Sequence, residues 1–262
     1  NVDADVTVLD FPSRERFVRE LKKGWDLVGI SFIAPNLVKA REMARLVRLH
    51  APSARIVLGG HGAAVEGIEE IVECDDVVRG EGIRGLRELL GQDVSAPVVH
   101  PVLQSTVRQS ILGIPVMGRP SNLLVPGVGC VNACRFCSTS HFFGKVYRPY
   151  LGTGRELFET ARRIADRTGT DDFFVMDENF LKDTARAREL LAEMERHRRW
   201  FGFQVFSSAE AIRAFGVDDM VRLGVSFVWI GVESATREGN YAKNEGVDAR
   251  ALVRELRDRG IT

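Results

Sequence analysis

The sequence lacks an excess of charge of either sign, long hydrophobic runs and a signal segment. Lys plus Arg and Asp plus Glu number 36 each among the 262 residues, so no net field draws the chain to nucleic acid or to an anionic membrane. The longest apolar runs, such as 227–232, fall well short of the ~20 residues that cross a bilayer. We therefore expect a cytoplasmic protein with neither a nucleic-acid nor a membrane partner.

Cysteine is also scarce, with four residues in the chain. Three of them lie within eight positions, between Cys130 and Cys137. This clustering favours metal ligation in a reducing compartment over a disulfide framework. The fourth, Cys74, is expected to lie alone on a helix as a small buried apolar residue.

The first part of the chain alternates strand and helix patterns. Apolar runs at 6–9, 27–33, 55–58 and 77–78 alternate with helical patterns at 14–23, 38–49, 63–73 and 82–90. Alternation of this kind predicts βαβ units and a parallel sheet with helices on both faces. We expect residues 1–95 to form a doubly wound, Rossmann-like α/β domain, with a further strand and helix upstream of the first residue.

Residues 96–120 interrupt this alternation, because four prolines in this stretch disfavour regular elements. The pattern resumes in residues 121–262, with strands expected at 123–126, 172–176, 201–207 and 226–231 and helices at 155–167, 184–198, 217–223 and 248–259. We interpret 96–120 as a linker and 121–262 as a partial (β/α) barrel, incomplete at its C-terminal end. Binding groups in such folds collect beyond the carboxyl ends of the strands.

The cysteine cluster follows the first of these strands and has the spacing C-x-x-x-C-x-x-C. A loop with this spacing can wrap the thiolates of Cys130, Cys134 and Cys137 around a 4Fe-4S cluster, so that the fourth iron has no protein ligand. Gly127 and Gly129 would allow the backbone to approach the cluster closely. The alternative is zinc, since His141 could complete a Cys3His set.

The cysteine spacing, its place after the first barrel strand and Phe136 just before the third cysteine resemble the radical S-adenosylmethionine (SAM) superfamily. The resemblance implies that the open iron binds the amino and carboxylate groups of SAM. It also implies that one-electron reduction yields a 5′-deoxyadenosyl radical, with electrons from a flavodoxin- or ferredoxin-like donor. The protein would supply orientation, while the cofactors carry the chemistry.

Polar residues at the other strand ends are further candidates for SAM contacts. Glu178 is the candidate for the methionyl amino group, with Asp177 as its rival, although the two glycines of the family's Gly-Gly-Glu-like motif are absent. The remaining candidates are Asn179, Ser207, Ser208, Glu233 and Ser234. The carboxylates could instead cap the following helix, and the serines could simply form turns.

Glycine-rich turns follow two strands of the N-terminal domain, namely Gly59-Gly60-His61-Gly62 and Arg79-Gly80-Glu81-Gly82. With a radical SAM barrel after it, this domain resembles the cobalamin-binding class of the superfamily. The resemblance implies that Gly59, Gly60, Gly80 and Gly82 lie against the cobalamin macrocycle. The glycines could equally serve tight turns.

The N-terminal domain lacks the D-x-H-x-x-G motif whose histidine ligates cobalt, and the corresponding loop reads Ala34-Pro35-Asn36-Leu37. The lower axial ligand of cobalt is therefore unassigned. His61 is a candidate replacement, although a histidine beside glycines in a loop is more often solvated or hydrogen-bonded.

The function that these resemblances imply is a cobalamin-dependent radical SAM methyltransferase acting on an unactivated carbon of a small-molecule or peptide natural-product-type substrate. One alternative keeps both cofactors but oxidises, cyclises or rearranges its substrate without methyl transfer. Another is a zinc-stabilised or cobalamin-sensing binding module without catalysis. No side chain of this sequence is assigned a catalytic role.

Overall fold

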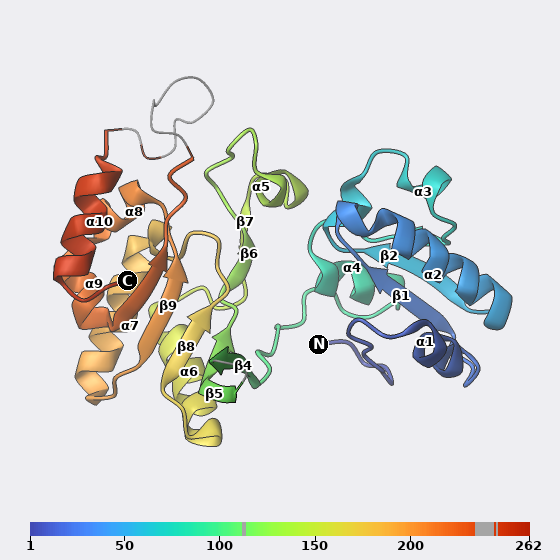
Figure 1. Cartoon of the computed structure of the whole chain (residues 1–262), viewed down its shortest axis with the longest axis horizontal. Helices are drawn as coiled ribbons and strands as arrows, with labels where there is room; N and C mark the ends of the chain where they lie inside the picture. Colours follow the sequence, from blue (N-terminus) through green and yellow to red (C-terminus); the bar gives the residue numbers. More distant parts are fainter. Residues whose placement is uncertain (112–113, 234–243, 245) are drawn as a thin grey trace. The chain divides into compact units, whose positions relative to one another are not determined.

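The protein folds into two compact units of mixed α/β structure (Figure 1). A computed structural model describes residues 1–111, 114–233, 244 and 246–262. One unit comprises residues 1–97 and 141–144, and the other comprises residues 98–140 and 145–262. No helix among these described residues is both long and apolar enough to span a membrane.

The first unit is built on a parallel sheet of three strands in the order β1-β2-β3. The strands are β1 (Leu27–Ser31), β2 (Arg55–Gly59) and β3 (Asp76–Val77). The four helices of residues 1–97 are α1 (Arg14–Leu21), α2 (Leu37–His50), α3 (Ile68–Ile71) and α4 (Gly82–Leu89). Ile30, Ile56 and Leu58 of the sheet are buried with Ala44 and Val47 of α2. The parallel sheet and its helices agree with the sequence-based expectation.

Three local predictions for this unit were wrong. Residues 6–9 form no strand, and Val6 and Val8 are exposed because no neighbouring strand pairs with them. The helix expected at 63–73 is reduced to α3 and a 3-10 turn at His61–Ala64, since the left-handed Gly67 (φ 64°) separates the two. Cys74 lies in the loop before β3, where it is half-buried against the core.

The second unit is built on a sheet of five strands in the order β10-β9-β8-β5-β4. The strands are β4 (Leu103–Ile111), β5 (Ile114–Leu124), β8 (Asp172–Val175), β9 (Gly202–Phe206) and β10 (Val225–Trp229). All neighbours pair in parallel except β4 and β5, which form an antiparallel hairpin. A separate antiparallel pair, β6 (Gly127–Gly129) with β7 (Tyr147–Pro149), flanks the cysteine loop.

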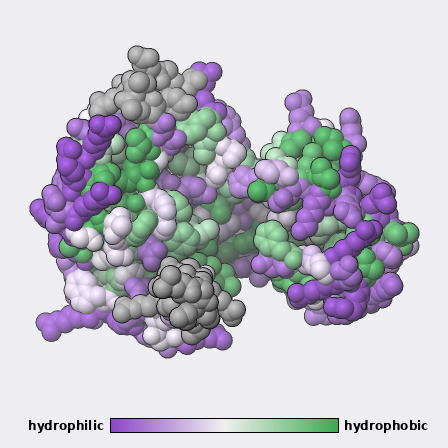
Figure 2. Space-filling model, in the orientation of Figure 1, coloured by the Kyte–Doolittle hydropathy of each residue, from purple (hydrophilic) through white to green (hydrophobic). Residues whose placement is uncertain are grey.

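Helices follow the parallel strands of this sheet (Figure 1). They are α6 (Gly154–Thr168), α7 (Thr184–His197), α8 (Ala209–Phe215), α9 (Val217–Leu223) and α10 (Ala249–Asp258), with a short α5 (Ser138–Phe142) after the cysteines and a 3-10 turn at Phe180–Lys182. Local sequence explains the bounds of α6, because Thr153 and Glu156 form a capping box and Gly169 ends the helix in the left-handed conformation. On α10, Leu252 and Leu256 are buried, while its outer face is hydrophilic (Figure 2).

The two faces of this sheet differ in burial. Phe173, Val175, Phe203 and Val205 are buried in one core with the helices. The alternate residues point to the other face, where the Trp229 ring contacts Phe174 and Phe206 at centroid distances of 5.2 and 4.8 Å. This is the alternation expected for strands covered by helices on one side.

The linker expected at 96–120 is instead largely the β4–β5 hairpin. Pro115 and Pro120 lie within β5, opposite Ser110 and Thr106. A proline is tolerated there because β5 pairs with β8 only from Asn122 to Leu124, so its earlier part lacks a second neighbour that would need an N–H donor. The sequence interpretation took the four prolines to exclude regular elements, whereas a strand section with a single neighbour tolerates them.

Candidate functional site

The three clustered cysteines lie in the loop between β6 and α5. Cys130 follows β6 directly, and Ser140 donates from Oγ to the Cys130 carbonyl at 3.0 Å. The Cys137 N–H donates to the Cys134 carbonyl at 3.1 Å, which closes a turn between these two residues. All three thiols are half-buried and none forms a disulfide. The loop therefore brings together three cysteines that form no disulfide.

The surroundings of Cys130 show what these thiols need. Burial raises the pKa of the Cys130 thiol, and the nearby Cys134, Cys137 and Glu178 raise it further by their negative charge. Three thiolates close together are thus unfavourable unless a bound cation compensates them. A metal centre supplies that compensation.

The donor geometry bears on which metal centre fits. Zinc binds thiolates at about 2.3 Å, so its ligands must converge on one ion. In the part of the chain that the structure describes, no three His, Cys, Asp or Glu residues converge in this way. A cubane binds each thiolate through a different iron and takes more widely spaced ligands. The C-x-x-x-C-x-x-C spacing therefore remains the argument for a 4Fe-4S cluster over the zinc alternative with His141.

Gly127 has a different role from the one expected from the sequence. A Cβ atom on Gly127 would lie 2.5 Å from the Arg148 carbonyl oxygen and 2.6 Å from the Tyr147 hydroxyl. The missing side chain makes room for the partner strand β7, rather than for a cluster. Gly129 has φ 88°, a conformation that favours glycine at the point where the cysteine loop begins.

Asp177 and Glu178 follow β8 but differ in environment. The Asp177 carboxylate is buried and accepts hydrogen bonds from Arg186 Nη2 at 2.9 Å and from the Tyr147 hydroxyl at 2.8 Å. Arg186 Nη1 also donates to the Tyr147 oxygen at 2.7 Å. These contacts occupy Asp177 within the fold, so the structure favours Glu178 as the carboxylate that can meet a ligand.

Glu178 has the properties of a binding carboxylate. Solvent reaches its side chain, yet protein surrounds much of it, and this desolvation raises the pKa of Glu178 to about 7. The neighbouring charge of Asp177 contributes to this rise, and a hydrogen bond with the Glu178 backbone partly opposes it. A bound cation such as an ammonium group would stabilise the anionic form of this carboxylate.

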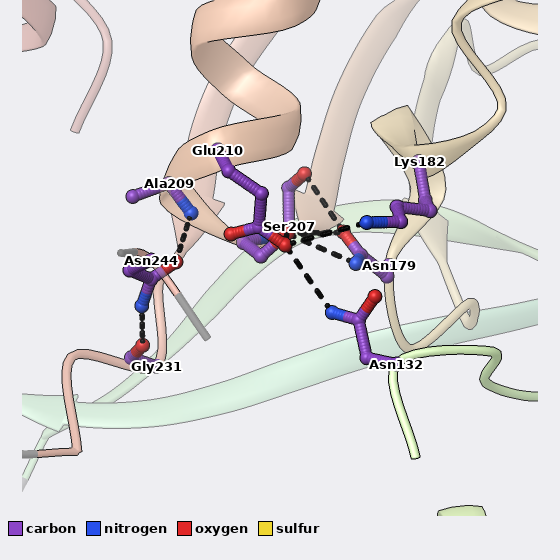
Figure 3. Close-up of polar contacts among 9 residues, drawn as sticks. Asn132, Asn179, Lys182, Ser207, Ala209, Glu210, Gly231 and Asn244 are labelled. Carbon is purple, nitrogen blue, oxygen red and sulfur yellow. Dashed lines mark hydrogen bonds and ion pairs between the residues drawn. The ribbon is translucent and has the colours of Figure 1, made fainter. Parts of the chain in front are cut away.

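The structure brings Asn179, Ser207 and Ser208 together in one buried network (Figure 3). Asn179 Oδ1 accepts from Ser207 Oγ at 3.2 Å and from the Ser208 N–H at 2.9 Å, while Asn179 Nδ2 donates to Ser208 Oγ at 3.0 Å. Ser208 Oγ donates to Glu210 Oε1 at 2.7 Å. These side chains hold the ends of β8 and β9 together, and their contact with SAM stays a prediction.

Sequence reasoning missed three polar residues that organise this region, namely Tyr147, Arg186 and Glu210. Tyr147 and Arg186 hold Asp177, and burial raises the pKa of the Tyr147 hydroxyl strongly. Glu210 contacts the cysteine loop through Asn132. No motif spacing marks these residues, because they come from separate elements that only the fold brings together.

The last two candidates lie after β10. Glu233 is exposed and has φ 62°, a left-handed conformation that is uncommon for a residue with a side chain. Ser234 lies outside the described residues. A contact of either residue with SAM stays a prediction, as does a contact of Phe136, which is 46% exposed beside Cys137.

The four candidate glycines of the first unit divide into two pairs. A Cβ on Gly59 or Gly82 would meet no atom within 4 Å. Gly60 and Gly80 have φ of 75° and 84°, and a Cβ on Gly60 would lie 2.7 Å from the Phe32 carbonyl oxygen. The backbone itself requires glycine at Gly60 and Gly80. Space is open beside Gly59 and Gly82, and a contact of any of the four glycines with cobalamin stays a prediction.

His61 lies in the 3-10 turn after Gly60. Its ring stacks on Phe142 at a centroid distance of 4.6 Å and meets the edge of Phe143 at 6.1 Å. Its Nε2 atom is buried and has no hydrogen-bond partner among the described residues. The half-buried ring packs against two aromatic side chains, which supports a packing role more than ligation of cobalt.

Family models match both parts of the chain. Residues 1–90 match the B12 binding domain, and residues 124–262 match the radical SAM superfamily. Among curated proteins, the cytidylyl-2-hydroxyethylphosphonate methyltransferase of Streptomyces wedmorensis is 36% identical over 62 residues. That match covers 24% of this chain and 11% of the relative.

Solved structures share the fold. The radical SAM methyltransferase TsrM from Kitasatospora setae, with cobalamin and a 4Fe-4S cluster bound, superposes with a TM-score of 0.65 at 19% identity. The match covers 93% of this chain and 58% of that one. A structure of the same enzyme with tryptophan substrate and the SAM analogue aza-SAM gives a TM-score of 0.62 at 18% identity, with coverage of 93% and 57%. The chain thus spans little more than half the length of the solved relative.

Proposed function

Because the chain belongs to the radical SAM superfamily and begins with a B12 binding domain, we propose that it is a cobalamin-dependent methyltransferase acting on an unactivated carbon. Residues 121–262 would hold the cluster and SAM, and residues 1–95 would hold cobalamin. When bound, the cluster and SAM supply a 5′-deoxyadenosyl radical and cobalamin supplies the methyl group. The protein contributes binding and orientation.

The observation that carries this proposal is the set of three half-buried cysteines in one loop, none of them in a disulfide, with Glu178 close enough to raise the pKa of Cys130. Cys130, Cys134 and Cys137 would each bind one iron. Glu178 would accept a hydrogen bond from the methionyl ammonium group of SAM. A charge-assisted hydrogen bond of this kind fixes the orientation of a ligand more strongly than a neutral one.

Asp177 would support Glu178 without contacting the ligand itself. Its ion pair with Arg186 holds the end of β8 in place, so that the adjacent Glu178 has a fixed backbone position. Asn179, on the other side of Glu178 in the sequence, would also fix the backbone of Glu178, because its side chain is hydrogen-bonded to both serines that follow β9. Rigid support of this kind keeps a binding group within the tolerance that a reacting ligand demands.

In the first unit, Gly59 and Gly82 would leave room for the macrocycle of cobalamin. Electrons would come from a flavodoxin- or ferredoxin-like protein, and the need for reduced thiols places the enzyme in the cytoplasm. The substrate would be a small molecule. The solved relative is described with tryptophan and the curated relative is named for a cytidylyl phosphonate, so these two compounds are the first to assay.

The test is an anaerobic assay with SAM, cobalamin, a reductant and each candidate substrate, followed by mass spectrometry. A product heavier by one methylene unit supports methyl transfer. Formation of 5′-deoxyadenosine with a product of altered structure but no added carbon indicates an oxidase, cyclase or rearrangement enzyme instead. The Cys134→Ala variant is the matched control, because it removes one cluster ligand while the other residues of the site stay.

A further inference from the structure

We propose that Glu210 is a positioning residue for the cluster, which it holds through Asn132 of the cysteine loop. The inference rests on the proposed function, since it concerns how the loop presents the cluster to SAM. Asn132 stands between Cys130 and Cys134, so a contact at Asn132 restrains two ligands at once.

The geometry places one carboxylate at the meeting point of three elements (Figure 3). Glu210 lies in the first turn of α8, and its Oε1 atom accepts a hydrogen bond from Asn132 Nδ2 at 3.3 Å. The same oxygen accepts from Ser208 Oγ at 2.7 Å and lies 3.6 Å from the Lys182 ammonium group. Glu210 thereby ties the cysteine loop to the ends of β8 and β9.

The cysteine loop needs such a restraint at this position. Ala133, next to Asn132, has φ 51°, a left-handed conformation that is unfavourable for a residue with a Cβ. Backbone conformations of this kind persist where the surrounding structure holds them. The hydrogen bond from Asn132 to Glu210 is a side-chain contact that fixes the loop directly before this residue.

Glu210 is itself well fixed. Burial raises the pKa of Glu210, but hydrogen bonds from Ser208, from the backbone and from Asn132 together with the charge of Lys182 outweigh this effect and lower the pKa. The carboxylate is therefore ionised at neutral pH and is a strong acceptor. Asn179 in turn donates a hydrogen bond to Ser208. Asn132 is therefore connected, through Glu210 and Ser208, to the buried network of Asn179.

The hydrogen bond is the part of this arrangement that matters for positioning. The side chains of Lys182 and Glu210 are 40% and 30% exposed, and an ion pair between groups of this exposure contributes little. A glutamine at position 210 keeps one acceptor oxygen for Asn132 and Ser208, loses the charge and replaces the other oxygen, Oε2, by an NH2 group. An alanine removes the acceptor.

The test measures SAM affinity and the electron paramagnetic resonance (EPR) spectrum of the reduced cluster in reconstituted protein. We expect Asn132→Ala and Glu210→Ala each to raise the Kd for SAM by roughly three- to tenfold, the range for one lost hydrogen bond, and to change the EPR spectrum with SAM bound. Glu210→Gln should change the Kd less than about twofold. The double alanine variant should be no worse than the weaker-binding single variant, because both remove the same contact.

A reversed pair gives an independent readout. Asn132→Asp places two carboxylates side by side and should weaken SAM binding more than Asn132→Ala does. Adding Glu210→Gln to this variant restores one donor and one acceptor, so affinity should recover. Glu255→Ala is the matched control. It removes a carboxylate of α10 that pairs with Arg213, which lies on α8 like Glu210 but makes no hydrogen bond to Asn132 in the described part of the chain.

Three outcomes would overturn the inference: an unchanged Kd and EPR spectrum in Glu210→Ala with full iron content, additive effects of the two alanine substitutions, or no recovery in the reversed pair. A lower melting temperature with wild-type SAM binding would assign Glu210 a structural role only. If the wild type itself binds no cluster or no SAM, the proposed function fails. If the wild type binds both and the variants equal it, only the role of Glu210 fails.

Discussion

The Nη2 atom of Arg186 lies 2.9 Å from Oδ2 of Asp177, and both side chains are at most 3% exposed. Because of this ion pair, the adjacent carboxylates of Asp177 and Glu178 have different roles. Asp177 is paired inside the protein, while Glu178 lies at the surface of the site with a pKa of about 7. A short acidic stretch at a strand end thus supplies one structural residue and one candidate ligand-binding residue.

Loss of Arg186 should be strongly destabilising. Arg186→Leu leaves the Asp177 carboxylate buried without its charged partner, which costs about 3–5 kcal/mol of unfolding free energy. Urea denaturation followed by circular dichroism measures this change. Arg162→Leu is the control, because Arg162 pairs with Glu159 on the exposed surface of α6 and should cost less than about 1 kcal/mol. Equal effects of the two substitutions would refute the structural role of the Arg186–Asp177 pair.

Glu178→Gln should stabilise the protein while weakening SAM binding. The folded-state pKa of about 7 exceeds the ordinary value of 4.5, so the folded state holds the proton more tightly. Wild-type stability therefore falls as pH rises from about 4.5 to about 7, and a glutamine removes this loss. The melting-temperature advantage of Glu178→Gln should grow across this window and then level off.

The same variant should raise the Kd for SAM at pH 8 by roughly tenfold or more, because it removes a hydrogen bond to a charged group. Isothermal titration calorimetry of the reconstituted protein measures this change. Glu159→Gln on the outer surface of α6 should leave the Kd unchanged. SAM affinity equal to wild type in Glu178→Gln would exclude Glu178 as the ammonium ligand.

The glycines of the first unit give a separate test for cobalamin. Gly59→Leu and Gly82→Leu add bulk where the protein leaves space, so they should weaken cobalamin binding with little change in melting temperature. Gly60→Leu should instead lower the melting temperature, because its φ of 75° and the nearby Phe32 carbonyl oppose a side chain. Gly29→Leu, in the middle of β1 and equally uncrowded, is the control. Unchanged cobalamin affinity in both Gly59→Leu and Gly82→Leu would exclude this docking surface.

Features of the fold that depend on neighbouring residues could be predicted from the sequence. The bounds of α6 follow from Thr153, Glu156 and Gly169, all of which act within one turn of the helix. The hairpin of β4 and β5 could not, because proline is excluded only from strands with two neighbours. Whether β5 has a second neighbour at Pro115 or Pro120 depends on where β8 pairs, which the local sequence does not encode.

The candidate site likewise contains features that the local sequence predicts and features that depend on residues far apart in the sequence. The cysteine spacing is local, so the cluster loop is readable from the sequence. Asp177 and Glu178 are adjacent, and only Tyr147 and Arg186, 30 and 9 positions from Asp177, decide which carboxylate is paired. Glu210 is 78 positions from Asn132 and has no signal in the sequence.

The central claim is that Cys130, Cys134 and Cys137 hold a 4Fe-4S cluster, and the most direct test is iron and acid-labile sulfide analysis of anaerobically reconstituted protein. We predict about four irons and four sulfides per chain in the wild type and in Cys74→Ala, whose thiol lies in the other unit. Cys130→Ala, Cys134→Ala and Cys137→Ala should each lose the cluster, since each thiolate holds a different iron. Stoichiometric zinc without sulfide in the wild type, or an intact cluster in any of these three variants, would contradict the account.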